Sequence, residues 1–164
     1  MEFKKLFSFF ALALCSTCAL AAELKVGDVA PDFSTTDDLG MPVSLRDYRG
    51  QTVILYFYPK DGTPGCTKEA ENFRDHIDAF TKKKAVILGV SFDSEAAHQK
   101  FKEKYKLPFR LLIDPDKKIA SAYGASGIFF ASRNTFVIAP DGKLLKIYRS
   151  VSPSQHAQEL LNSF

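Results

Sequence analysis

Three largely apolar runs in the middle of the chain, the first of them unbroken, predict buried β-strands. They span residues 53–58, 85–92 and 109–113. Each run is rich in β-branched and aromatic side chains, as strands covered on both faces are. Between the runs, apolar residues recur every three or four positions, which is the period of an amphipathic helix. This spacing predicts one helix that begins near Cys66 and ends at about Thr81, and a second helix over 95–105.

Turn and cap signals extend this pattern toward both ends of the chain. Leu39-Gly40 is typical of a turn and predicts an N-terminal hairpin between the short segments 34–38 and 43–45. Near the other end, Ser152 and Pro153 predict the start of a last helix. Ser152 would act as its N-cap and Pro153 as its first helical residue.

A second turn signal predicts an antiparallel pair of strands late in the chain. Asp141-Gly142 would join strands over 134–139 and 144–148. Residues 23–164 contain no repeat and no linker of low complexity, so they predict one α/β domain. The order of elements fits a thioredoxin-like fold: a central mixed β-sheet flanked by helices, with an N-terminal β-hairpin.

The first 22 residues have a different pattern, which is that of a secretory signal peptide. Lys4-Lys5 is followed by the apolar run 6–14 and by small residues that end at Ala21 and Ala22. We therefore expect cleavage near these alanines, a mature domain over 23–164, and a periplasmic or secreted location. The apolar run is shorter than the ~20 residues that span a bilayer, so no stable membrane association is expected. A retained anchor is the alternative.

The cysteines separate into two groups. Cys15 and Cys18 have C-x-x-C spacing but lie within the signal-like segment, so we interpret them as part of it. Lipidation is a minor alternative, because neither follows a small residue suited to it. Cys66 is then the only thiol of the mature domain. It cannot form an intramolecular disulfide there, and a single cysteine in an exported protein calls for an explanation.

Composition and charge exclude some partners. With 46% hydrophobic residues, the chain can bury one ordinary core. Its net charge of +3 is too small to indicate a nucleic-acid partner. The three histidines, His76, His98 and His156, are scattered singly, so neither a metal site nor another cofactor is expected.

Cys66 falls where the loop after the first central strand becomes a helix. Free backbone N–H groups and the positive end of the helix dipole would favour its thiolate, which is the nucleophilic form. Thr63 is near enough for its hydroxyl to hydrogen-bond the thiolate or a bound oxygen. Pro59 and Pro64 stiffen the loop, and Gly65 allows close approach of the backbone. A buried structural cysteine is the alternative, but this context favours a reactive thiol.

The residues around Cys66 resemble the active-site motif of peroxiredoxins, thiol peroxidases that reduce peroxides with a cysteine. The motif is Pro59-x-x-x-Thr63-x-x-Cys66. The wider stretch 56–70, followed by Phe73-Arg74-Asp75, resembles the Q-type subfamily, also called bacterioferritin comigratory proteins. The likeness extends over nearly all of the mature domain, from 26–33 to 134–138 and 141–143.

The resemblance implies roles for four residues. Cys66 would be the peroxidatic cysteine, and Thr63 would orient the peroxide through its hydroxyl. Pro59 would shield the thiolate, and Arg133 would place a guanidinium beside it. The thiolate would attack one peroxide oxygen, while preorganised donors stabilise the charge on the departing oxygen. Cys66 would then become a sulfenic acid.

One position departs from the Q-type pattern. Many Q-type members carry a resolving cysteine five residues after the peroxidatic one, where this chain has Glu71. A sulfenic acid on Cys66 would therefore need an external thiol, from glutathione or from a thioredoxin-like or glutaredoxin-like protein. Slow resolution would also favour sulfinic acid formation under excess peroxide. Likeness to Q-type members favours a monomer.

The same residues allow other functions and other roles. A disulfide reductase or isomerase would need a second cysteine where Glu69 stands, so this function is disfavoured. A redox sensor or a holdase needs no second thiol and stays an alternative. For Glu69 itself, stabilisation of the helix start is favoured over a role in the site. Phe129 and Phe130 are the expected edge of a substrate pocket.

Overall fold

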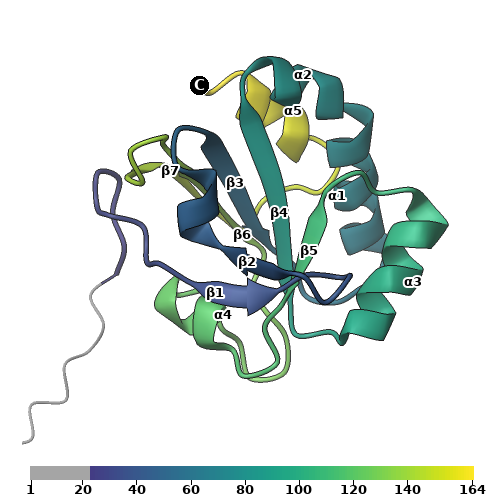
Figure 1. Cartoon of the computed structure of the whole chain (residues 1–164). Coiled ribbons are helices and arrows are strands. Elements are labelled where there is room, and N and C mark those ends of the chain that lie inside the picture. The colour runs from purple at the N-terminus through teal and green to yellow at the C-terminus, as the bar shows by residue number, and fades with distance from the viewer. Residues whose placement is uncertain (1–22) are drawn as a thin grey trace, which may run out of the picture.

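A computed structural model describes residues 23–164, which form a five-stranded sheet with helices on both faces and a small separate hairpin (Figure 1). The strands of the sheet are β3 (Thr52–Phe57), β4 (Ala85–Ser91), β5 (Arg110–Ile113), β6 (Asn134–Ile138) and β7 (Leu144–Arg149). The helices are α1 (Pro64–Asp75), α2 (Ile77–Lys82), α3 (Glu95–Tyr105), α4 (Lys118–Ala122) and α5 (His156–Leu161). The hairpin consists of β1 (Ser34–Thr36) and β2 (Pro42–Ser44), and the 3₁₀ helix η1 (Leu45–Tyr48) follows it.

The strand order of the sheet is β5-β4-β3-β6-β7. β3 pairs in parallel with β4, and β4 in parallel with β5, whereas β6 runs antiparallel to both β3 and β7. Leu55 in the central strand β3 thus lies between Leu88 of β4 and Phe136 of β6. This topology is a thioredoxin-like fold, and it confirms the predicted mixed sheet and N-terminal hairpin.

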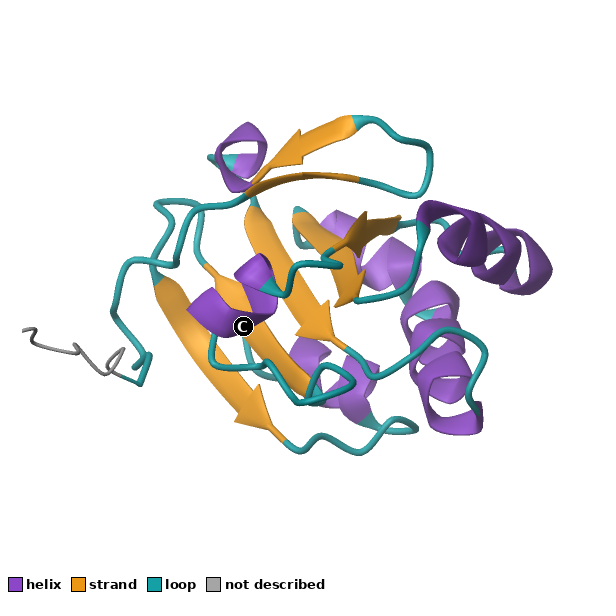
Figure 2. Ribbon diagram, turned by 90° about the horizontal axis from the view of Figure 1, so that it is seen from below, coloured by secondary structure: helices purple, strands orange, loops and turns teal. Residues whose placement is uncertain are grey.

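Alternate side chains of β3 enter two different cores, because successive residues of a strand point to opposite faces. Val53, Leu55 and Phe57 pack with α4 and the N-terminal hairpin. Ile54 and Tyr56 pack on the other face with α1, α2, α3 and α5. The two layers of helices can be followed in Figures 1 and 2. The second core contains Cys66, so the packing of this face positions the site.

The predicted helix from Cys66 to Thr81 is divided in two. α1 ends at Asp75 and α2 begins at Ile77, because His76 between them has φ −108° and ψ 8°. The His76 ring also lies close to the Asn72 carbonyl, with Nδ1 at 2.8 Å. The apolar residues keep their helical spacing across this break, so the sequence pattern did not predict it. The short helices α4 and η1 were not predicted.

The predicted start of the last helix is wrong. Ser152 and Pro153 precede α5, which begins at His156, and residues 153–155 form a turn instead. The cap comes from another helix: the Asn72 side chain of α1 accepts a hydrogen bond from the Ala157 N–H at 3.0 Å. A local cap signal was therefore overridden by a tertiary contact.

The predictions for the N-terminal segment concern residues that the structure does not describe. The expected signal peptide, together with Cys15 and Cys18, lies outside the described residues 23–164. Over that described part of the chain, no helix has the length and apolarity that crossing a membrane requires.

Candidate active site

The candidate nucleophile lies at the junction between β3 and α1. After Phe57 ends the strand, the N–H of Tyr58 donates to the Val90 carbonyl at 3.1 Å and continues the pairing. A short loop follows, and Thr63 caps α1 with extended backbone angles (φ −73°, ψ 150°). Pro64 is the first helical residue, a position where the N–H that it lacks would have no helical partner. The helix therefore begins at a stiff turn.

Cys66 is the third residue of α1. Its thiol is free, and the residue is only 1% exposed within the core between the sheet and the helices. The first helical hydrogen bond runs from the Thr67 N–H to the Thr63 carbonyl at 2.8 Å. The N–H groups of Gly65 and Cys66 precede this bond and point out of the helix start. Together with the helix dipole, they provide donors for a negatively charged oxygen atom beside the sulfur.

Arg133 brings a guanidinium to the same sulfur. The residue immediately precedes β6, and β6 pairs with β3, so the sheet sets the distance between Arg133 and Cys66. Its Nη2 donates to Cys66 Sγ at 3.4 Å. Gly65 makes room for it, since a β-carbon there would lie 3.3 Å from the same Nη2. The structure thus places Arg133 beside Cys66, as expected.

Glu69 belongs to the charged part of the site, and the prediction that it stabilises the helix start is wrong. The side chain lies beyond the first turn of α1, the residue is 1% exposed, and its carboxylate pairs with Nη1 of Arg133. Burial raises the pKa of Glu69 to about 7, although the charge of Arg133 opposes the shift. Sequence spacing placed Glu69 near the dipole, but only the fold turns this face of α1 toward Arg133.

Burial and neighbouring charges also shift the pKa values of Arg133 and His156. Burial lowers the pKa of Arg133, but Glu69 and the Cys66 sulfur outweigh this effect and raise the pKa above its ordinary value. For the buried His156, desolvation and the charge of Arg133 lower the pKa to about 4, so the imidazole is neutral at pH 7. Its Nε2 lies 2.8 Å from Thr135 Oγ1. Arg133 is therefore the cation that acts on Cys66.

Thr63 and Pro59 flank the same loop. Pro59 follows Tyr58 directly and is half-buried. The Thr63 hydroxyl donates to the Lys60 carbonyl at 3.1 Å, so in this structure it braces the loop. Its lone pairs stay able to accept a hydrogen bond from a bound peroxide. That contact, and the shielding of the thiolate by Pro59, stay predictions.

The expected pocket edge lies in the segment between α4 and β6. Phe129 is 78% exposed and Phe130 is 50% exposed. The Lys117 ammonium holds this segment by donating to the Ile128 carbonyl at 2.6 Å. The segment leads directly to Arg133, but contact of the two aromatic rings with a substrate stays a prediction.

The arrangement supports nucleophilic attack by sulfur. Backbone N–H groups and the Arg133 guanidinium surround Sγ, where they can bind an oxygen atom that gains charge. Within residues 23–164, the structure has no group of three His, Cys, Asp or Glu side chains that could hold a metal ion. A buried free thiol beside a guanidinium, at this helix start of a thioredoxin-like fold, points to the class of thiol peroxidases.

Comparison with known proteins gives the family. The model of the AhpC/TSA family matches residues 26–147. The chain is 43% identical over 148 residues to peroxiredoxin Bcp of Bacillus subtilis. This match covers 85% of this chain and 94% of that protein. The protein therefore belongs to the AhpC/TSA family, and within it to the peroxiredoxins of the Bcp and PrxQ type.

Solved structures agree with this assignment. Peroxidoxin BcpB of Mycobacterium tuberculosis matches with a TM-score of 0.82 and 35% identity, over 86% of this chain and 96% of that one. A cysteine-to-serine mutant of PrxQ from Xylella fastidiosa also has a TM-score of 0.82, with 30% identity over 86% and 95% of the two chains. The protein is a thiol peroxidase, which uses a peroxide as substrate and a thiol as reductant.

Proposed function

We propose that the protein is an exported one-cysteine peroxidase that reduces hydrogen peroxide and small organic hydroperoxides with electrons from an external thiol. The observation that carries the proposal is the 3.4 Å approach of Arg133 Nη2 to the Cys66 sulfur at the start of α1. Support for organic substrates comes from the bacterioferritin comigratory protein of Xanthomonas campestris. That protein is 32% identical, with a TM-score of 0.76, and is described as having alkyl peroxide reduction activity.

The first half of the reaction oxidises the sulfur. The Cys66 thiolate attacks one peroxide oxygen, so that an S–O bond forms while the O–O bond breaks. The departing oxygen takes a proton and leaves as water or an alcohol, and Cys66 becomes a sulfenic acid. Arg133 and the N–H groups at the helix start stabilise the charge that develops on the departing oxygen.

The second half returns the sulfur to a thiol. An external thiol displaces water from the sulfenic acid and forms a mixed disulfide, and a second thiol releases Cys66 and carries away the disulfide. Glu71, at the position of the Q-type resolving cysteine, lies half-buried on α1, 3.6 Å from the Arg74 guanidinium. Because Cys66 is 1% exposed, a protein thiol can reach its sulfur only when the first turn of α1 opens.

The test is the rate at which the reduced protein, residues 23–164, loses its one thiol to stoichiometric hydrogen peroxide. Rapid quenching and intact mass follow the reaction, because the chain has no tryptophan to report it. We expect a rate orders of magnitude above that of free cysteine and no oxidation in Cys66→Ser. A rate equal to that of free cysteine would contradict the proposal.

The reductant and the alternatives are distinguished by turnover. With glutathione or a thioredoxin-like protein as donor, a peroxidase consumes many equivalents of peroxide. A redox sensor would instead keep a lasting mixed disulfide with its partner, and a holdase would suppress aggregation even as Cys66→Ser. Size-exclusion chromatography with light scattering tests the proposed monomer.

Export rests on the pattern of residues 1–22 and is tested separately. The full chain is expressed in a Gram-negative host, and the periplasmic fraction is analysed by intact mass. We expect a species that begins near Glu23. A full-length species confined to the cytosol would contradict export without affecting the peroxidase chemistry.

A further inference from the structure

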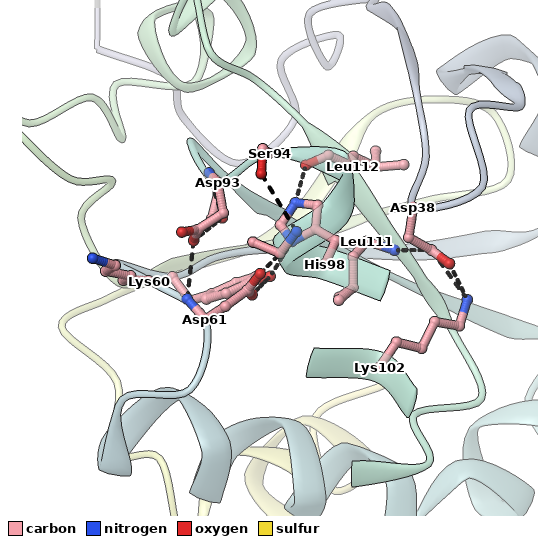
Figure 3. Close-up of polar contacts among 12 residues, drawn as sticks. Asp38, Lys60, Asp61, Asp93, Ser94, His98, Lys102, Leu111 and Leu112 are labelled. Atoms are coloured by element: carbon pink, nitrogen blue, oxygen red, sulfur yellow. Dashed lines mark hydrogen bonds and ion pairs between the residues drawn. The ribbon is translucent and has the colours of Figure 1, made fainter. Parts of the chain in front are cut away.

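A second polar network lies behind the loop that carries Thr63 and Cys66. His98, in the first half of α3, is completely buried, and Asp61 reaches it from the loop. His98 Nδ1 lies 2.7 Å from Asp61 Oδ2, and its Nε2 lies 3.3 Å from the Leu112 carbonyl oxygen on β5 (Figure 3). The reaction steps described above use none of these groups.

Hydrogen bonding ties the His98 ring to the loop and to β5. Both ring nitrogens of His98 face oxygen atoms that act here as acceptors, a carboxylate and a carbonyl. The Tyr58 hydroxyl donates to Asp61 Oδ1 at 2.7 Å and also lies 3.4 Å from His98 Nδ1. His98 Nδ1 therefore donates to the Asp61 carboxylate, which can only accept.

This hydrogen bond is removed from solvent. The side chain of His98 is 0% exposed and that of Asp61 is 8% exposed. Loss of a donor to a buried polar group is unfavourable, because the group is left without a hydrogen-bond partner. Without the His98 N–H at Nδ1, the Asp61 side chain would keep only its bond from the Tyr58 hydroxyl, and the loop would be held less firmly.

The backbone of the loop is tied down at the same residue. The Asp61 N–H donates to Asp93 Oδ2 at 2.9 Å, and Ser91 Oγ donates to the same carboxylate oxygen at 2.7 Å. Gly62 follows in the left-handed region with φ +71°, and Thr63 then caps α1. The position of Asp61 therefore determines where the helix start lies relative to the sheet.

We propose that His98 is a positioning residue for peroxide reduction. Through Asp61, it holds the loop so that Thr63 and the N–H groups at the start of α1 meet a peroxide at Cys66. The role rests on the proposed function of Cys66. Its effect on rate is large because a displacement of about 1 Å can slow an enzyme about 10²-fold.

A matched pair of variants separates this role from a contribution to folding alone. The amide of His98→Asn lies near the position of Nδ1 and keeps the bond to Asp61, whereas the longer His98→Gln reaches toward the Leu112 carbonyl instead. Each variant is tested against hydrogen peroxide and against iodoacetamide. Alkylation by iodoacetamide requires a thiolate but no hydrogen-bond donors aimed at a peroxide oxygen.

We expect His98→Gln to slow the reaction with peroxide about tenfold or more, while alkylation changes less than about threefold. His98→Asn is expected to stay within about threefold of the wild type in both reactions. Equal losses in the two variants, or a wild-type peroxide rate in His98→Gln, would overturn the role.

A second pair of variants covers the case in which a change at the buried His98 prevents folding. Asp61→Asn keeps an oxygen that accepts from His98, and Asp61→Ala removes it. The alanine variant should lose peroxide reactivity selectively, and equal rates in the two would overturn the role. A slow wild type would overturn the proposed function of Cys66 as well, whereas a fast wild type with a fast His98→Gln overturns only the role of His98.

Discussion

Replacement of Arg133 by alanine removes the cation nearest to the reacting sulfur. At the observed 3.4 Å from Nη2 to Sγ, two unit charges interact by about 5 kcal/mol if the effective dielectric constant is ~20. Loss of one preorganised donor from a comparable site costs about 2.7–4 kcal/mol, because water and neighbouring donors replace part of the interaction. We therefore expect the peroxide reaction of Arg133→Ala to be about 10²–10³-fold slower.

The fold should tolerate this change. Glu69 loses its partner, but its pKa is already raised to about 7, so it can take up a proton instead of staying as an unpaired buried charge. The assay is rapid-quench oxidation by hydrogen peroxide at pH 7, and the midpoint of chemical denaturation serves as the folding control.

Arg133→Lys is the matched control. It keeps a positive charge but lacks the planar fork that contacts Cys66 and Glu69 together, so its rate should lie between those of the wild type and Arg133→Ala. A peroxide rate of Arg133→Ala within about threefold of the wild type would refute the electrostatic reasoning. Equal rates in the two variants would show that the charge itself contributes nothing.

Glu69, Cys66 and Phe73 each provide a further prediction. Because Glu69 titrates near 4.5 when unfolded and at about 7 when folded, the folded state binds the extra proton between these values, and burial of the charge costs stability as the pH rises through this window. Relative to Glu69→Gln, the wild type should lose up to about 3 kcal/mol of unfolding free energy as the pH rises from 4.5 to about 7. Urea denaturation at several pH values measures this loss. A difference between the two proteins that does not change with pH would contradict the raised pKa of Glu69. Excess peroxide should add two oxygen atoms to Cys66, seen by intact mass, and absence of this sulfinic acid at concentrations that oxidise all of the thiol would mean that resolution is fast without a second cysteine. Phe73→Ala should cost about 3–5 kcal/mol, because Phe73 is 0% exposed and its ring packs 4.8 Å from that of Tyr56; a loss below about 1 kcal/mol in denaturant would contradict this packing.

Local patterns in the chain predicted most of the sheet and the placement of Cys66 at the start of a helix. The runs at 53–58 and 85–92 correspond closely to β3 and β4, since a strand covered on both faces is mostly apolar. The placement of Cys66 at a helix start was also predicted, because Pro64 and the apolar spacing after it are local signals.

Local patterns failed where a distant side chain changed the outcome. Ser152 and Pro153 form a strong cap signal, yet Asn72 of α1 provides the contact at the start of α5. Glu69 occupies a helical position that suits either solvent or core. It became a buried partner of Arg133 because β6 lies beside β3.

The sequence by itself thus determined that a cysteine follows a stiff loop at the start of a helix in an α/β domain. These properties depend on residues within a few positions of one another. Only the tertiary structure decided which charges surround that cysteine. Arg133 reaches Cys66 across 67 positions, and His98 reaches Asp61 across 37, through pairing of strands and packing of helices. Hydrophobic periodicity determines which face of an element is buried, but the partner that the face meets depends on how the whole sheet is assembled.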